Sequence, residues 1–98
     1  GLVYKVKFPS PGIEKKFFKE LDKVSPKALR DEILKTASSL AENPRPKGEP
    51  KIKPPIEVYN YLAHFRLAVA NWRIFYDVDD KLRTVWIFAL RKRDERTY

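Results

Sequence analysis

The sequence contains no cysteine and only one histidine among 98 residues. Disulfides and thiolate metal sites are therefore excluded, and a zinc site is not expected. No apolar run reaches the roughly 18–20 residues that cross a bilayer. The first apolar stretch, residues 2–8, is short and interrupted by Lys5 and Lys7, so it does not resemble a secretory signal. We expect a cytoplasmic protein that uses no cofactor and no metal.

Acidic residues are also scarce, because 13 Asp and Glu accompany 21 Lys and Arg and leave a formal net charge of +8. Such a charge favours a polyanionic partner, namely RNA, DNA, an anionic membrane or an acidic protein, without choosing among them. Hydrophobic residues make up 43% of the chain, which is enough for one core. We therefore expect a single domain over residues 1–98.

The first half of the chain predicts one strand and two helices. Residues 2–8 alternate between apolar and polar with period two, as a half-buried strand does. Apolar residues at four-residue spacing then predict amphipathic helices over about 11–24 and 26–42. Ser10 and Ser25 each precede a proline and are the expected N-caps. Together the two helices form a helical hairpin.

Residues 43–55 contain five prolines and one glycine, which predicts a loop without regular structure. This basic loop is either a solvated connector or a ligand-contacting element. The chain continues through residues 56–62 into a hairpin. Residues 82–90 are apolar on both faces, as in a strand buried on both sides. The order β-α-α-β-β-β predicts an α+β fold: a small antiparallel or mixed sheet with the helical hairpin packed on one face.

The hairpin lies within residues 63–80, AHFRLAVANWRIFYDVDD. We predict a two-residue turn at Ala70–Asn71, because Asn tolerates the left-handed conformation that such turns need. Facing residues share one side of a sheet. One side then carries Phe65, Leu67, Val69, Trp72, Ile74 and Tyr76. The other carries His64, Arg66, Ala68, Arg73, Phe75 and Asp77.

The helices are expected to cover the apolar side, which leaves two arginines and the histidine on the other. In the simplest interpretation Arg66 and Arg73 are solvated or paired with Asp77. The basic loop and the tail, with Arg91, Lys92, Arg93 and Tyr98, favour a ligand instead. Arginines grip phosphate, and Phe75 or Tyr98 can stack a base of single-stranded RNA. Cleavage by a ribose 2′-hydroxyl needs charge stabilisation and proton transfer but no metal.

Three motifs, in this order, make the chain resemble the RelE/ParE superfamily of type II toxin–antitoxin toxins. They are NPRPKG (43–48), NWRIFYDVDD (71–80) and LRKRDERTY (90–98). The resemblance covers almost the whole chain and favours the RelE branch. It implies that the protein cuts mRNA in the ribosomal A site without metal, through a cyclic phosphate. ParE-type members instead poison DNA gyrase and lack the cationic catalytic set.

Matched position by position, the RelE pattern falls on His64, Arg66, Arg73, Arg93 and Tyr98. It implies that Arg73 and Arg93 stabilise phosphoryl charge, with Lys92 competing for the role of Arg93 because the tail differs in length by one residue. Arg66 positions the phosphate or assists proton transfer, and Tyr98 orients the nucleotide or takes part in proton transfer. His64 stands where the family often has lysine and is the candidate proton acceptor.

The resemblance also implies partners: a cognate acidic antitoxin, the ribosome and mRNA, with no membrane. The residues expected to contact RNA outside the catalytic set are Arg45, Lys47, Lys51, Lys53, Phe75, Arg91 and Lys92. Two alternatives stay open, a noncatalytic gyrase inhibitor and a catalytically inactive RNA-binding protein. A metal-dependent nuclease is disfavoured because Asp77, Asp79 and Asp80 lie at a turn, where aspartate is ordinary.

Overall fold

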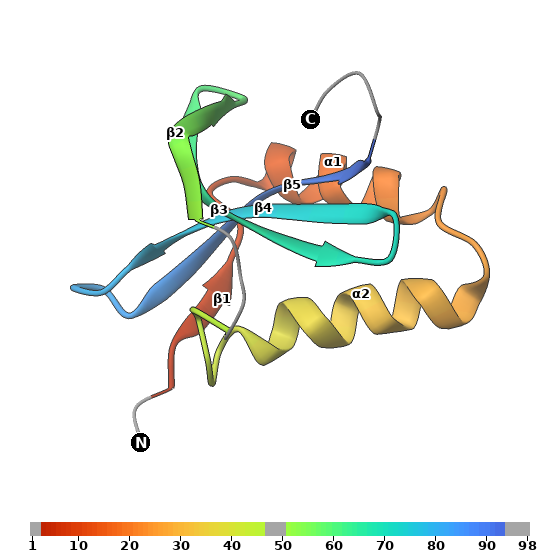
Figure 1. The fold of residues 1–98 in the computed structure, drawn as a ribbon, viewed down its shortest axis with the longest axis horizontal. Helices are drawn as coiled ribbons and strands as arrows, with labels where there is room; N and C mark the ends of the chain where they lie inside the picture. Colours follow the sequence, from red (N-terminus) through yellow and green to blue (C-terminus); the bar gives the residue numbers. More distant parts are fainter. Residues whose placement is uncertain (1–2, 47–50, 94–98) are drawn as a thin grey trace.

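A computed structural model describes residues 3–46 and 51–93. In chain order its elements are β1 (Lys5–Lys7), α1 (Pro11–Leu21), α2 (Lys27–Ser39), β2 (Lys51–Val58), β3 (Tyr61–Val69), β4 (Trp72–Asp79) and β5 (Thr84–Lys92). The strands form one sheet in the order β1-β5-β4-β3-β2, in which β1 lies parallel to β5 and the other neighbours are antiparallel. Figure 1 shows α2 beneath the strands and the β2–β3 turn rising above them. The predicted α+β class and mixed sheet are confirmed.

The two helices begin differently. At α1 the Ser10 hydroxyl accepts a hydrogen bond from the Ile13 N–H, and Pro11 occupies the first turn, as predicted. At α2 the prediction that Ser25 is the N-cap is wrong. Pro26 holds that position in an extended conformation, with its carbonyl accepting from Leu29 N–H, and makes no side-chain cap. Among the described residues, no helix is long and apolar enough to cross a membrane.

The β3–β4 hairpin has the predicted register, with Val69 opposite Trp72 and Leu67 opposite Ile74. The turn residue with a positive φ is Ala70, at 53°, whereas the prediction gave this role to Asn71. A positive φ at the first turn position fits a type II′ turn, whose twist matches that of the strands. The register therefore depends on turn length, which the sequence predicts correctly.

The main core lies between the sheet and the helices. The α1 residues Ile13, Phe17 and Leu21 are buried, and the last two pack against the apolar side of the hairpin. Ile33 and Leu40 from the α2 region join the same cluster, as do Val85, Ile87 and Leu90 from β5. This helix-side cluster confirms that the helical hairpin covers the apolar side of the sheet.

The strand β2 corrects the loop prediction for residues 43–55, and it adds one strand to the predicted order. It contains Pro54 and Pro55, and its pairing with β3 is irregular between Lys51 and Ile56. Proline lacks the N–H that an interior strand needs, but β2 is the edge of the sheet, where this loss is tolerated. The β2–β3 hairpin helps to build a second buried cluster, on the side away from the helices: Ile52, Val58, Ala63, Phe75, Phe88 and Ala89.

Candidate functional site

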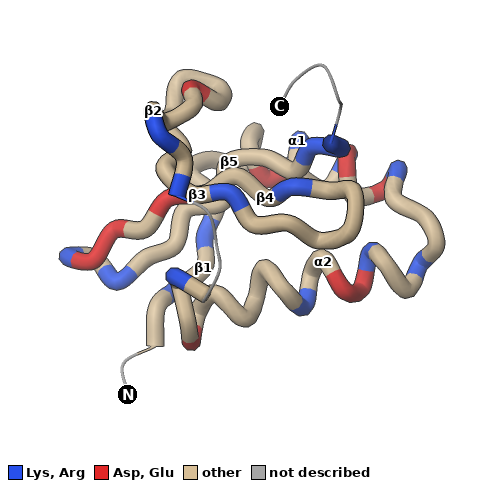
Figure 2. The backbone as a smooth tube through the Cα atoms, in the orientation of Figure 1, with Lys and Arg blue, Asp and Glu red and all other residues tan. Residues whose placement is uncertain are grey.

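Three rows of neighbouring residues cross β3, β4 and β5 on the side away from the helices. From the hairpin turn outward they are Ala68–Arg73–Arg91, Arg66–Phe75–Ala89 and His64–Asp77–Trp86. Because facing pairs share a side of the sheet, the register brings four basic residues together. We call this side the open face and define it by His64, Arg66, Arg73 and Arg91. Figure 2 shows basic positions along these strands.

Arg73 is held at the hairpin turn by its own backbone neighbourhood. Its Nη1 donates to the carbonyl oxygens of Ala70 (3.0 Å) and Trp72 (2.9 Å). Both acceptors are neutral, so these bonds orient the guanidinium without cancelling its charge. A guanidinium has five N–H donors, and the remaining donors of Arg73 can bind an anion.

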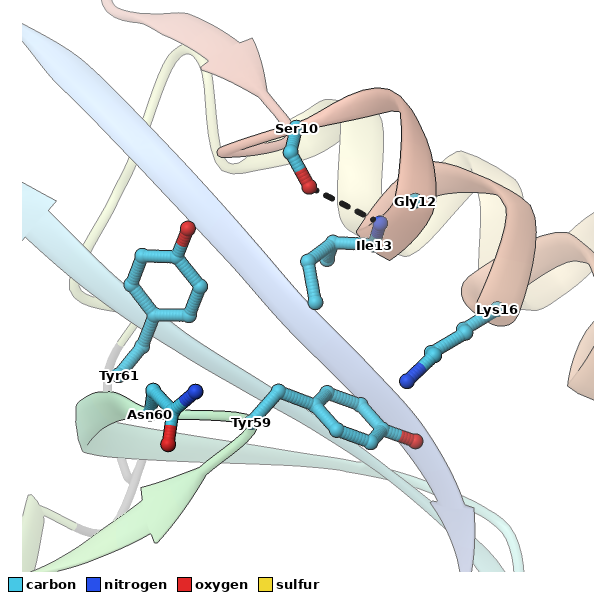
Figure 3. Close-up of a pocket in the computed structure, with 7 residues that line it drawn as sticks. All are labelled: Ser10, Gly12, Ile13, Lys16, Tyr59, Asn60 and Tyr61. Atoms are coloured by element: carbon cyan, nitrogen blue, oxygen red, sulfur yellow. Dashed lines mark hydrogen bonds between the residues drawn. The ribbon is translucent and has the colours of Figure 1, made fainter.

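Arg91 is positioned by two aromatic rings. Its guanidinium carbon lies 5.6 Å from the centre of the Tyr59 ring and 5.7 Å from that of Phe75. Tyr59, at the β2–β3 turn, also receives the ammonium of Lys16 from α1, 4.2 Å from its ring centre (Figure 3). Such cation–π contacts fix both the turn and Arg91. Sequence reasoning missed Tyr59, because no local pattern shows that this turn folds over the sheet.

Phe75 does not have the role that the sequence suggested. The ring is fully buried, in the second cluster and beside Arg91, so the prediction that it stacks a base is wrong. The β2–β3 hairpin supplies Ile52, Val58 and Ala63 to the same cluster. The alternation along β4 places Phe75 on the open face, but only the tertiary structure shows that this part of the face is covered.

His64 and Asp77 form a pair at the other end of these rows, and the predicted facing of the two residues is confirmed. The His64 Nδ1 lies 3.0 Å from Asp77 Oδ2, and the Val78 N–H donates to Asp77 Oδ1 at 2.9 Å. Both side chains are about one-third exposed. A carboxylate at Nδ1 favours the tautomer with its proton there, which leaves the lone pair on Nε2. The pair therefore offers an oriented proton acceptor.

The end of β5 distinguishes between the tail residues. Lys92 pairs with Trp72, whose side chain belongs to the helix-side cluster, so Lys92 lies away from the open face. Arg93 is exposed, and its N–H donates to the Asn71 carbonyl at 2.6 Å. β5 ends at Lys92, so Arg93 lies just beyond the strand that carries Arg91 on the open face. Tyr98 and Lys47 lie outside the described residues.

Comparisons with known protein families and solved structures give matches that cover most of the chain. Residues 13–97 match the family model described as the ParE toxin of the type II toxin–antitoxin system parDE. The chain belongs to this toxin family. The search of curated proteins found no match.

Solved structures similar to the toxin have the same fold. An archaeal RelE–RelB complex from Pyrococcus horikoshii matches with a TM-score of 0.71 and 23% identity, over 96% of this chain and 99% of that chain. The RelBE2 toxin–antitoxin complex from Mycobacterium tuberculosis gives 0.65 and 20%, over 94% and 93%. The isolated RelE toxin of E. coli gives 0.64 and 18%, over 94% and 86%. At these identities the likeness establishes the RelE-like α+β fold.

Arg45 of the toxin lies apart from the open face. Its Nη1 and Nη2 donate to the two carboxylate oxygens of Asp80, at 3.2 and 3.0 Å, and the Tyr4 hydroxyl donates to the same carboxylate at 2.6 Å. The hydrogen bond from Arg45, with that from Tyr4, lowers the pKa of Asp80. The hydrogen bond to Asp80 raises the pKa of Tyr4. The guanidinium also lies over Phe65, a residue of the helix-side cluster. Arg45 thus anchors its own segment to the β4–β5 turn.

The lysines of β2 are likewise not brought to the open face. Lys51 pairs with Phe65, which belongs to the helix-side cluster, whereas its neighbour Ile52 enters the second cluster. Lys53 is exposed and alternates with Ile52. Within residues 3–46 and 51–93, no group of three or more His, Cys, Asp or Glu side chains is placed to hold a metal ion.

Proposed function

We propose that this toxin is an endoribonuclease that cuts mRNA on the ribosome and so inhibits translation. One observation supports this proposal above all: Arg66, Arg73 and Arg91 share one face of the sheet with the His64–Asp77 pair. Guanidinium groups bind phosphate oxygens with paired hydrogen bonds, and an oriented imidazole transfers protons. This combination is what cleavage of a phosphodiester by a neighbouring hydroxyl requires.

The reaction uses the ribose of the RNA as its own nucleophile. The 2′-oxygen forms a bond to phosphorus while the bond from phosphorus to the 5′-oxygen breaks, which leaves a cyclic phosphate. The 2′-hydroxyl proton passes to His64 Nε2, and the leaving 5′-oxygen receives a proton from a general acid, with Tyr98 and Arg66 as the candidates. Arg73 and Arg93 stabilise the charge that develops on the phosphoryl oxygens. No step depends on a bound metal ion.

A cognate antitoxin is part of the proposal. Two of the similar structures are toxin–antitoxin complexes. The toxin carries a formal net charge of +8, so an acidic partner that covers the open face would both bind well and block RNA. Antitoxin and RNA then compete for the same arginines.

A translation reaction programmed with a defined mRNA tests the activity directly. The purified toxin is added with and without EDTA, and cuts are mapped by primer extension. We expect cuts within codons that need ribosomes, persist in EDTA and disappear with Arg73→Ala. Lys35→Ala, an exposed change on α2, is the matched control and keeps the cuts. Intact mRNA with the wild-type toxin would overturn the nuclease proposal.

The family match favours one second candidate, a noncatalytic inhibitor of DNA gyrase, because the matching family model is named for ParE. In that case the target is a protein and the helices supply the contact surface. Phe18 and Leu34 are partly exposed on α1 and α2, where such contacts would form. A gyrase supercoiling assay discriminates: inhibition that survives Arg73→Ala and is lost with Phe18→Ser or Leu34→Ser identifies the gyrase inhibitor.

A further inference from the structure

An aromatic pocket of about 280 Å³ lies beside the candidate catalytic pair. Its lining residues are Pro9, Tyr61, Trp86 and Phe88. The rings of Tyr61 and Phe88 are stacked, with centroids 5.2 Å apart and planes 13° apart. Trp86 is half-buried, so part of its indole is accessible. Three aromatic side chains therefore border a single opening, and none of them was singled out by the sequence analysis.

The register of the sheet fixes the position of this pocket. Trp86 on β5 pairs with Lys7 on β1 and with Asp77 on β4, and Asp77 binds His64 on β3. A row of four neighbouring residues thus crosses the sheet on one side. Facing residues on adjacent strands are roughly 4.5–5.5 Å apart at Cβ, so Trp86 is one strand away from Asp77 and two from His64. The aromatic pocket and the catalytic pair are therefore joined through Trp86, which neighbours Asp77 on the same side of the sheet.

Basic groups accompany the aromatic rings. Lys7 is exposed next to Trp86. A second pocket of about 320 Å³ shares Tyr61 and is lined also by Ser10, Asn60 and Lys16. Figure 3 shows Lys16 and the two tyrosines bordering this second pocket. Proteins that hold single-stranded nucleic acid combine flat rings for the bases with positive groups along the backbone.

We propose that the aromatic pocket binds one nucleobase of the RNA whose scissile phosphate lies on the open face. This inference rests on the proposed nuclease function and adds a specificity-determining residue to it. Trp86 stacks on the base, and the stacked rings of Tyr61 and Phe88 form the opposite wall. Ligand pockets usually occupy roughly 300–1,000 Å³, so this pocket of about 280 Å³, just below that range, accepts one ring system rather than a whole nucleotide.

Tryptophan fluorescence makes the pocket observable. The toxin has two tryptophans, and Trp72 is buried in the helix-side cluster with 7% of its surface exposed, so a ligand-dependent change reports on Trp86. The purified toxin is titrated at low salt with a short single-stranded RNA and with an abasic RNA of the same length and charge. We expect the intact RNA to quench the emission and to bind about tenfold more tightly, since stacking contributes roughly 1–3 kcal/mol per base.

Variants assign this preference to the pocket. Trp86→Leu should remove most of the preference for intact RNA, whereas Trp86→Phe should keep part of it. Tyr61→Leu, on the opposite wall, gives an independent test if the Trp86 variants do not fold. Leu82→Ala, at an exposed apolar residue of the β4–β5 turn, is the control and should keep the preference in full.

The possible failures are distinguishable. Equal binding of intact and abasic RNA, with both weakened by Arg73→Ala, would overturn the base pocket and leave the RNA-directed function in place. No binding of either RNA by the wild-type toxin would overturn both proposals. Quenching of Trp86 by an acidic protein partner but not by RNA would also overturn the nucleobase assignment, because the pocket would then anchor a protein side chain.

Discussion

Arg45 and Arg73 show how differently two arginines of one small domain can be used. Arg45 donates hydrogen bonds to both carboxylate oxygens of Asp80, which also accepts one from the Tyr4 hydroxyl. The charge of Arg45 is therefore paired, and the contact ties a loop to a turn. Arg73 donates to two neutral carbonyl oxygens, and its charge remains available. Net charge alone favours both as RNA ligands. The pairing of each cation, rather than the number of cations, locates the candidate site.

Among the variants that test the difference between the open face and Arg45, we expect His64→Ala to have the largest effect on the cleavage rate. Removing a positioned general base costs roughly 10²–10⁴ in rate. Arg45→Ala should leave the cleavage rate unchanged, because Arg45 lies away from the open face. Single-turnover cleavage in a programmed ribosome complex measures both variants. A His64→Ala toxin that cuts at the wild-type rate would remove the histidine from the mechanism.

Asp77 and Asp80 should differ in the same way as His64 and Arg45, with a smaller effect on the cleavage rate. Asp77→Asn replaces the carboxylate that orients His64, and a hydrogen bond to a charged group contributes about 1.5–3 kcal/mol, or roughly 10- to 100-fold in rate. The same substitution at Asp80 should not change the rate. Equal rates for the two Asn variants would show that the Asp77 contact is structural only.

The salt dependence of RNA binding should also distinguish Arg66, on the open face, from Arg45, although the expected difference is smaller. Each phosphate contact to a single strand contributes roughly 0.7 to the slope of log K against log salt. Arg66→Ala should lower that slope by about this amount, whereas Arg45→Ala should not change it. Titrations of a short RNA over a range of salt concentrations measure the slope. Identical slopes for the two variants would show that Arg66 contacts RNA phosphate no more than Arg45 does.

The smallest effect concerns the pH dependence of folding stability. Arg45 and Tyr4 lower the pKa of Asp80 below its usual value of 3.8, so the native state favours the ionised carboxylate. The resulting stability is complete above pH 3.8 and is lost as the pH falls through the lower pKa of the folded state. Asp80→Asn should reduce this acid-dependent loss. Denaturation midpoints across the acid range check the slope, and an unaltered profile would show that the contact adds no stability.

Much of the fold follows from local rules. Four-residue spacing and Ser10 with Pro11 place α1, because these residues act within a few positions of one another. A two-residue turn places the hairpin in register, and the register puts Arg66, Arg73, His64 and Asp77 on one side. The position of Arg91 on the open face could not be predicted in this way. It depends on the pairing of β5 with β4, which is irregular between Phe75 and Tyr76. Trp86 was missed for the same reason.

The sequence by itself determined the α+β class and the faces of the hairpin, which place His64 and Asp77 on one side. Only the tertiary structure decided which cations stay available, because Arg45 finds Asp80 across 35 positions of the chain. It also decided that β2 continues through two prolines at the sheet edge and that its hairpin helps to bury Phe75. Periodicity reports which side a residue faces. What covers that side depends on contacts between distant segments, which no local pattern encodes.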